Sequence, residues 1–252
     1  MIELDFALAR GEFSLQLALQ SQARALALFG DSGCGKTSTL LAIAGLLRPA
    51  RGRIVLDDRV LFDSRAGANV PVAQRHLGMV FQDVRLFPHL SVRDNLGYGV
   101  PRSRGAARLD AAVQLLGLEG LLRRKPGELS GGQARRVAIG RALLSEPAAL
   151  LLDEPLSNLH REARAEVLEH LRGLKRELAL TTILVSHQAD EVLALADAVA
   201  LLDDGRLRSV LPIAEFASEV QPDTMPFAVQ PCPSLGEASR LRTEGSRDAE
   251  RP

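Results

Sequence analysis

The sequence predicts an α/β fold with a mainly parallel sheet, an antiparallel β region at the N-terminus and a helical insert. Three observations lead to this prediction. From residue 149 onward, short apolar segments alternate with helical ones, which is typical of parallel strands joined by crossover helices. Near residue 30 a glycine-rich loop stands between an apolar segment and a helical one. The first twenty residues alternate between apolar and polar, as strands buried on one face do.

The N-terminal third is predicted to consist mainly of strands. Apolar residues occupy every second position in residues 2–8 and 13–19, with Arg10-Gly11-Glu12 between them, which predicts an antiparallel hairpin. Residues 25–29 form a short apolar strand that leads into the glycine-rich loop. A helix over about 36–47 follows the loop, and further strands are predicted at 53–56 and 77–81.

The middle of the chain, from about 84 to 145, is predicted to be a helical subdomain. Ser91 followed by Asp94 is an N-cap signal, and residues 106–116 and 133–144 show helical spacing. Strands then alternate with helices: strands at 149–153, 182–186 and 199–202, helices at 161–177 and 190–195. Asp203-Asp204-Gly205-Arg206 predicts a hairpin turn.

The chain is therefore expected to form one domain over residues 1–211 and a different segment over 212–252. This last segment is interrupted by Pro212, Pro222, Pro226, Pro231 and Pro233, and small and charged residues follow from Ser234 onward. Such a composition cannot bury enough apolar surface to fix the chain. We expect an irregular, flexible tail.

The composition is that of an ordinary globular protein and argues against bulk electrostatic binding of nucleic acid. The 252 residues are 46% hydrophobic, and Lys+Arg and Asp+Glu balance at 31 each, whereas nucleic-acid binding favours a basic excess. The two cysteines, Cys34 and Cys232, do not suggest a disulfide framework. Neither a signal peptide nor an apolar run long enough to span a membrane is evident. We expect a cytoplasmic protein that reaches a membrane only through a partner.

The glycine-rich loop predicts a phosphate-binding site of the P-loop NTPase type. Its residues are Gly30, Asp31, Ser32, Gly33, Cys34, Gly35, Lys36 and Thr37, followed by Ser38. The glycines allow backbone conformations that turn several N–H groups into one concavity, and the next helix adds its positive end. Lys36 would reach the β- and γ-phosphates, and the Thr37 hydroxyl would ligate Mg²⁺. The alternative is a chance glycine-rich turn, against which the flanking strand and helix argue.

Two consecutive acidic residues, Asp153 and Glu154, end a strand of nearly continuous leucine. Ligands of open α/β sheets bind at the carboxyl ends of the strands. Asp153 is therefore expected to hold Mg²⁺, and Glu154 to polarise the attacking water. The alternative is a solvated acidic loop.

Three further segments give residues 1–210 a resemblance to the ATP-binding subunits of ABC transporters. They are the signature Leu129-Ser130-Gly131-Gly132-Gln133, Phe81-Gln82-Asp83, which resembles the family's Q-loop, and Ser186-His187, which matches its switch histidine. The resemblance implies an ATPase with ATP and Mg²⁺ as cofactors. It also implies that Gln82 contacts Mg²⁺ or the water and senses a membrane partner, and that His187 contacts the γ-phosphate.

In that family the signature contacts the nucleotide held by a second subunit, which implies a head-to-tail homodimer. Ser130, Gly131, Gly132 and Gln133 would then belong to the partner's nucleotide site. Local physics fits this role, because Ser130 can cap the following helix and two glycines let its N-terminus approach an anion. Considered alone, Gln82 could be an ordinary loop amide and His187 a hydrogen-bonded structural histidine.

Two positions depart from the family pattern. His160 stands where family members usually carry an aspartate that shapes the contact between subunits; alternatively, His160 simply begins the next helix on its exposed face. The family also commonly stacks adenine on an aromatic residue of the first hairpin. Here Phe13 is near, yet its place in the alternation fits the core equally well, and the Arg10 guanidinium could stack instead.

The segment 85–96 resembles bacterial importer ATPases for oxyanions, sugars and polyamines. Three stretches, 29–38, 52–56 and 80–89, resemble more closely the ATPases of molybdate importers. Those proteins usually carry a C-terminal oxyanion-binding domain, for which the roughly forty residues after Leu211 are too few. The resemblance implies an integral-membrane permease and, indirectly, an external substrate-binding protein as partners, which choose the cargo. Sulfate, polyamine, sugar and thiamine remain alternatives.

Two other classes compete with an importer ATPase. A soluble ABC ATPase of DNA repair or translation is disfavoured by the neutral charge and by the absence of a long coiled-coil insert or second cassette. A P-loop kinase or GTPase is disfavoured by the signature at 129–133.

Overall fold

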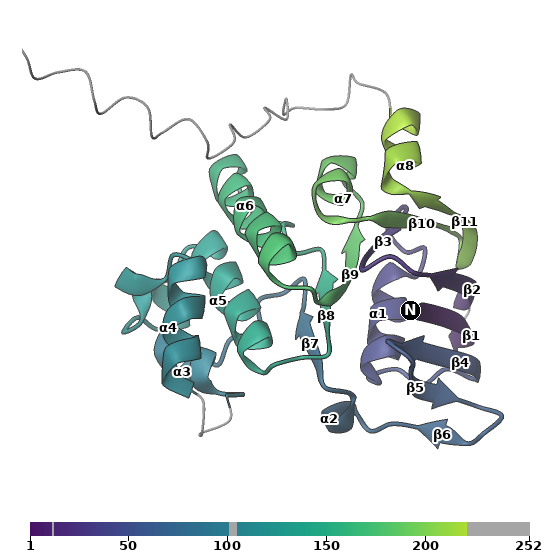
Figure 1. The fold of residues 1–252 in the computed structure, drawn as a ribbon, viewed down its shortest axis with the longest axis horizontal. Coiled ribbons are helices and arrows are strands. Elements are labelled where there is room, and N and C mark those ends of the chain that lie inside the picture. The colour runs from purple at the N-terminus through teal and green to yellow at the C-terminus, as the bar shows by residue number, and fades with distance from the viewer. Residues whose placement is uncertain (12, 101–104, 221–252) are drawn as a thin grey trace, which may run out of the picture. The chain divides into compact units, whose positions relative to one another are not determined.

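The computed structural model describes residues 1–11, 13–100 and 105–220, without the side chains of Arg10 and of residues 105–107. Within these residues eleven strands form one sheet in the order β6-β5-β4-β1-β2-β11-β10-β3-β9-β8-β7 (Figure 1). The sheet combines an antiparallel part, which contains the first strands of the chain, with a parallel part. The predicted α/β class is confirmed.

The antiparallel part contains the predicted hairpin. β1 (Ile2–Arg10) pairs along its whole length with β2 (Phe13–Ser21), and on its other side with β4 (Arg51–Leu56). β5 (Arg59–Asp63) and β6 (Ala68–Asn69) extend this part outward. In β2 the alternate residues Leu15, Leu17 and Leu19 are buried, as their spacing predicts.

The parallel part places five carboxyl strand ends at one edge of the sheet. β7 (Leu77–Val80), β8 (Ala149–Asp153), β9 (Thr181–Ser186), β3 (Ala25–Phe29) and β10 (Ala198–Asp203) are all parallel to their neighbours in this series. β11 (Arg206–Pro212) forms the predicted hairpin with β10 and joins the antiparallel part through a parallel pairing with β2.

The helices lie on both faces of the sheet. α1 (Lys36–Ala44) packs with the β1–β2 hairpin into one apolar cluster, whereas α5 (Gly131–Leu144), α6 (Arg161–Glu177) and α7 (Ala189–Leu195) belong to the other. The strands feed both clusters: in β3, Leu26 and Leu28 face α1 and Ala27 faces the opposite side. The remaining helices are α2 (Val72–Arg75), α3 (Val92–Gly97), α4 (Gly105–Leu115) and α8 (Ile213–Glu219), with 3₁₀ turns at Glu119–Leu121 and Pro126–Glu128.

The segment predicted as a helical subdomain, about 84–145, contains α3, α4 and α5. These helices follow β7 and precede β8 in the sequence, and they lie together in space (Figure 1). α5 contacts both α3 and α4. α3 begins at its predicted cap, because the Ser91 hydroxyl accepts a hydrogen bond from the Asp94 amide at 3.1 Å. α5, which follows the signature serine, leads in the chain to β8.

Helix α1 ends three residues earlier than its apolar pattern suggests. Gly45 adopts φ 81°, and its amide and that of Leu46 bond back to carbonyls of the last turn, a stop that glycine favours. Arg75, fully buried, donates from Nη1 to the Ala42 and Ile43 carbonyl oxygens at 2.9 and 2.6 Å. A cation thus satisfies the carboxyl end of the helix that follows the glycine-rich loop.

The ordered fold continues past the predicted boundary at residue 211, because α8 occupies part of the segment expected to be irregular. Phe216 of α8 is buried and its ring meets that of Phe29 edge-on, with centroids 5.3 Å apart. The rest of the predicted tail, 221–252, lies outside the described residues.

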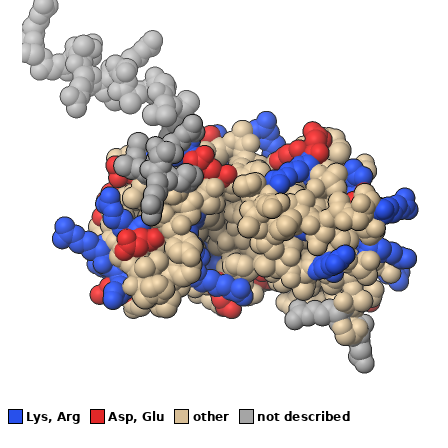
Figure 2. Space-filling model, turned by 90° about the horizontal axis from the view of Figure 1, so that it is seen from below, with Lys and Arg blue, Asp and Glu red and all other residues tan. Residues whose placement is uncertain are grey.

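Surface charge is mixed. Figure 2 shows Lys and Arg on both halves of the face in view, with Asp and Glu among them. None of the helices in the described part of the chain is long and apolar enough to cross a membrane.

Candidate functional site

The glycine-rich loop joins β3 to α1 at the carboxyl edge of the sheet. Gly30 has φ 152°, and a Cβ there would lie 2.1 Å from the Leu202 carbonyl oxygen; Gly35 has φ 105°, and its Cβ would meet the Leu15 side chain at 2.7 Å. Both positions therefore require glycine. Gly33 also has positive φ, 86°, but open space around it. β10 and β2 thus lie so close to the loop that they leave no room for a side chain at Gly30 or Gly35.

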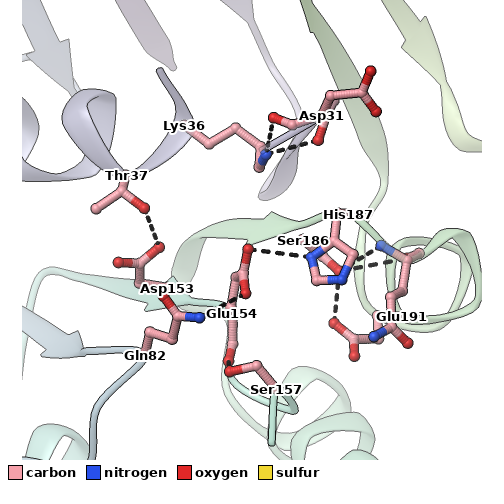
Figure 3. A network of polar contacts seen from close by, with 12 residues as sticks. Asp31, Lys36, Thr37, Gln82, Asp153, Glu154, Ser157, Ser186, His187 and Glu191 are labelled. Atoms are coloured by element: carbon pink, nitrogen blue, oxygen red, sulfur yellow. Dashed lines mark hydrogen bonds and ion pairs between the residues drawn. The ribbon is translucent and has the colours of Figure 1, made fainter. Parts of the chain in front are cut away.

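Lys36 is folded back onto this loop. Its side chain is buried, with 5% of the residue exposed, and Nζ donates to the carbonyl oxygens of Gly30 and Asp31, both at 2.7 Å (Figure 3). The buried Cys34 sulfur lies 3.8 Å from the same nitrogen. Gly35 occupies the N-cap of α1, so no cap side chain covers the first amides of the helix. A buried cation and free helix amides together form a cradle for an anion.

Thr37 and Asp153 face each other, although they stand far apart in the sequence. The Thr37 hydroxyl donates to Asp153 Oδ1 at 2.9 Å. Asp153 is buried, and burial raises its carboxyl pKa, an effect that the Thr37 hydrogen bond opposes. A hydroxyl and a carboxylate at this distance supply the hard oxygen ligands that Mg²⁺ prefers.

The protein ligands here are few. Among the described residues no group of three or more His, Cys, Asp or Glu side chains converges on a metal-sized space. Mg²⁺ in nucleotide sites commonly uses one or two protein oxygens together with substrate phosphates and water, so the Thr37–Asp153 pair fits that ion. Gln82, the third predicted ligand, bonds to Glu154 instead.

Glu154 is held from two sides. The Gln82 amide donates from Nε2 to Glu154 Oε2 at 3.0 Å, and His187 Nδ1 lies 3.2 Å from Oε1 (Figure 3). The Glu154 backbone has φ 44°, an uncommon conformation for glutamate, and its amide donates to the Val185 carbonyl of β9. The three predicted catalytic residues thus meet at one carboxylate.

A second layer behind His187 was not predicted from the sequence. Glu191 of α7 is 2% exposed and accepts a hydrogen bond from the Ser186 hydroxyl at 2.7 Å. Burial raises the pKa of Glu191, and Arg164 of α6, 3.2 Å away, opposes that shift. Sequence spacing could not reveal this contact, because α6 and α7 meet only in the folded chain.

The loop and the three predicted catalytic residues line one cleft of about 720 Å³, whereas Asp153 and Glu191 lie behind its lining. Its walls include Ser32, Gly33, Gly35, Lys36, Thr37 and Ser38 from the loop, Gln82, Glu154 and His187, and Phe13 from β2. Phe13 is half-buried and packs close to Gly35. It therefore belongs to both the core and the cleft, while the Arg10 side chain lies outside the described part of the structure.

The signature lies at a different place. Ser130 caps α5 with a reciprocal pair of bonds: its hydroxyl accepts from the Gln133 amide at 3.3 Å, and Gln133 Oε1 accepts from the Ser130 amide at 3.0 Å. Gly131 and Gly132 pack against Leu159 and Ala163 at the start of α6. Within the described residues, these four signature residues are not part of the cleft lining.

His160 serves as the N-cap of α6. Its Nδ1 accepts a hydrogen bond from the Ala163 amide at 3.4 Å, and the residue is exposed. This geometry matches the expectation that His160 begins the helix on its exposed face. Its predicted part in a contact between subunits stays a prediction.

Comparison with known proteins adds independent information. A family model described as ABC transporter matches residues 14–157. The protein named Molybdenum import ATP-binding protein ModC of Paramagnetospirillum magneticum is 49% identical over 222 residues, which cover 87% of this chain and 61% of that protein. Its namesake in Rhodospirillum rubrum is 45% identical over 91% of this chain and 62% of its own length. The chain thus spans about three fifths of these relatives.

Solved structures show the same fold. CbiO1 from Clostridium perfringens, part of an ABC transporter complex, superposes with a TM-score of 0.71 at 27% identity, covering 86% of this chain and 90% of that one. The dimeric bacterial ABC transporter cassette MJ0796 gives 0.69 at 26% identity, with 84% and 99% covered. With the loop, the acidic strand end and the signature in the order described, the chain belongs to the ABC transporter family.

Proposed function

We propose that this chain is the ATP-hydrolysing subunit of an ABC importer and converts ATP and water to ADP and phosphate. One observation carries the proposal: the lining of a single cleft contains Lys36, Thr37 and Glu154. Thr37 is bonded to the buried Asp153, and Glu154 is held by an amide and an imidazole. Phosphoryl transfer needs little more than such positioning and charge stabilisation.

The phosphates would bind at the start of α1. Lys36 would exchange its bonds to two loop carbonyls for bonds to phosphate oxygens, and the loop amides and helix N-terminus would hold the remaining charge. Thr37 and Asp153 would hold Mg²⁺, which, when bound, neutralises charge developing on the phosphates. Phe13, on the cleft wall, supports stacking of the adenine ring.

Glu154 would accept a proton from the attacking water. Gln82 and His187 each bond to one of its carboxylate oxygens and so restrict its rotation. Glu191 and Arg164 restrict the segment carrying His187 in turn. Such fixed geometry is what general-base catalysis requires.

The complete site would contain two copies of the chain. Ser130 to Gln133 form the N-terminus of α5, whose partial positive charge attracts an anion, but they are not part of the cleft lining. The matching cassette MJ0796 has a dimeric structure. A head-to-tail homodimer would bring each signature to the partner's nucleotide.

The proposed cargo is molybdate, on the strength of the names of relatives that are 45 to 49% identical. The chain would act at the cytoplasmic face of the membrane, bound to an integral-membrane permease that is served by an external binding protein. The cargo is chosen by those partners.

Uptake and association test the proposal together. The purified chain should hydrolyse ATP, and a tagged copy should retain a membrane permease. Deletion of its gene should reduce uptake of labelled molybdate, and complementation should restore it. Association with ribosomes or DNA instead of a permease would contradict the importer assignment, and loss of sulfate or sugar uptake alone would contradict molybdate as cargo.

A further inference from the structure

Arg135 of the signature helix α5 holds the backbone of the segment that carries Gln82. The residue is 2% exposed. Its Nη1 donates to the Phe81 carbonyl oxygen at 2.5 Å and its Nη2 to the Gln82 carbonyl oxygen at 2.6 Å. The two arms of one guanidinium thus hold consecutive peptide units, a geometry that a planar fork provides and a lysine ammonium does not.

A buried arginine at position 135 stabilises the fold less than an apolar side chain of similar volume would. Nε of Arg135 has no hydrogen-bond partner within the described residues, and burial lowers the pKa of the guanidinium, against the attraction of Asp83, Asp153 and Glu191. A buried cation with an unmet donor costs free energy that an apolar side chain of similar volume would not. The two short bonds to the Phe81 and Gln82 carbonyls offset this cost.

The contact leads in one step to the proposed catalytic carboxylate. Arg135 fixes the main chain of Gln82, and the side chain of Gln82 donates to Glu154 Oε2 at 3.0 Å. Arg135 itself stands five residues after Ser130 on one rigid helix. A shift of α5 would consequently move the backbone of Gln82, and with it the side-chain amide that orients Glu154.

We infer that Arg135 is a positioning residue for hydrolysis, which makes the placement of Gln82 against Glu154 depend on the position of the signature helix. The inference rests on the proposed function, because it assigns Arg135 a part in the same reaction. Arg135 touches neither nucleotide nor water in this scheme and acts only through Gln82.

The neighbouring Arg136 is a matched control. It lies on the same helix, is 5% exposed and likewise leaves Nε unpaired within the described residues. Its Nη1 donates to the carbonyl oxygens of Leu116 and Gly117 at 2.8 and 3.1 Å, and its Nη2 pairs with Glu166 at 3.0 Å. The two arginines are thus alike in burial and in their bonds to two consecutive carbonyls. Arg136 also pairs with Glu166, and it binds the residues that follow α4, which do not line the cleft.

The test compares Arg135→Met, Arg135→Lys and Arg136→Met in ATPase assays and amide hydrogen exchange. We expect Arg135→Met to lower kcat roughly 10- to 100-fold, since small misplacements have effects of this size, with KM for ATP within about twofold of wild type. The kcat of Arg135→Lys should lie between those of Arg135→Met and wild type, because lysine keeps the charge but cannot bond to both carbonyls as the planar guanidinium does. Arg136→Met should leave kcat within about twofold. Exchange should rise at residues 81–83 only in the Arg135 variants, and at 116–118 only in Arg136→Met.

A double-mutant cycle with Gln82→Ala gives the sharper result. If Arg135 acts through Gln82, Arg135→Met should lower kcat little further in the Gln82→Ala variant. Any effect of Arg136→Met on kcat should be the same with and without Gln82. Equal kcat losses for Arg135→Met and Arg136→Met, or a full Arg135 effect without Gln82, would overturn the inference. A wild-type chain that does not hydrolyse ATP would refute the proposed function instead, and exchange at 81–83 would still decide whether Arg135 positions the segment.

Discussion

At the residue scale, Glu154 owes its orientation to Gln82 and His187, whose bonds to its two oxygens leave little rotational freedom. Glu154→Gln keeps the shape and an oxygen acceptor but removes the charge that draws a proton from water. We expect hydrolysis to fall by about 10²- to 10⁴-fold, with an ATP-bound dimer accumulating in gel filtration. The exposed Glu162→Gln on α6 is the control. A monomeric Glu154→Gln variant that hydrolyses ATP normally would refute its assignment.

Asp153 illustrates a conflict between stability and chemistry. Its folded-state pKa is raised, chiefly by burial, so between the unfolded and folded pKa values the folded state binds more protons, and stability falls as pH rises through this range. At neutral pH the ionised carboxylate therefore destabilises the metal-free protein. Asp153→Asn, which can still accept the Thr37 hydrogen bond, should raise Tm at pH 7 and lower Mg²⁺-dependent hydrolysis roughly 100-fold.

The pH series distinguishes this cause from a general change in packing. The Tm difference between Asp153→Asn and wild type should shrink at acidic pH, where both forms are uncharged at this position. A variant that is less stable than wild type at pH 7 would show that the carboxylate stabilises the fold.

At the element scale, the starts of α5 and α6 are packed so closely that Gly132 cannot carry a side chain. A Cβ there would lie 2.9 Å from the Cβ of Ala163, which is fixed to the backbone. Gly132→Ala should separate the two helices slightly and destabilise the protein by about 1–3 kcal/mol. Gly173→Ala, in the interior of α6 with open space around it, should instead stabilise by up to about 1 kcal/mol. Urea unfolding of both variants checks the contrast.

The elements show where sequence patterns predict structure well. Short continuous apolar runs predicted β3 and β8, and helical spacing predicted α6, all with the bounds that the structure has. The missed elements, β5, β6 and α2, are short, and their positions depend on neighbours: β5 pairs with β4, and Arg75 of α2 is buried against the end of α1. The same reason explains α8, whose single buried Phe216 gives no period to detect.

The candidate site divides in the same way. Glycine spacing predicted Lys36 and Thr37, and the acidic strand end predicted Glu154, because these signals depend on local backbone geometry. Gln82 and His187, which also line the cleft, were predicted from the family resemblance. The Glu191–Arg164 pair and the Arg135 fork could not be predicted, since each depends on which helix faces which loop. Gln82 was predicted near Mg²⁺, and its bond to Glu154 emerged only from the folded chain.

At the scale of the whole molecule, the cleft and the signature are separate surfaces that only a second copy would unite. Lys36→Ala and Ser130→Arg should each abolish hydrolysis as pure dimers. In a mixture, the heterodimer combines one intact loop with the other chain's intact signature. With random pairing, about half of the dimers carry one working site of two, so activity should recover to roughly one quarter of wild type.

This recovery measures whether the signature acts in trans. If Ser130 served the nucleotide of its own chain, the mixture would remain inactive at every ratio. Ser130→Arg also removes the cap of α5, at about 1 kcal/mol, so thermal melting should accompany the assay to show that both variants are folded.

The back-folded Lys36 has a consequence for association thermodynamics. Fixing a long lysine side chain costs up to about 2 kcal/mol of conformational entropy, and here the two loop carbonyls fix it before any ligand arrives. That entropy is lost when the chain folds and not when the nucleotide binds. This saving of entropy favours nucleotide binding by roughly tenfold for each 1.4 kcal/mol spared. It is set against the two carbonyl bonds that Lys36 exchanges for bonds to phosphate.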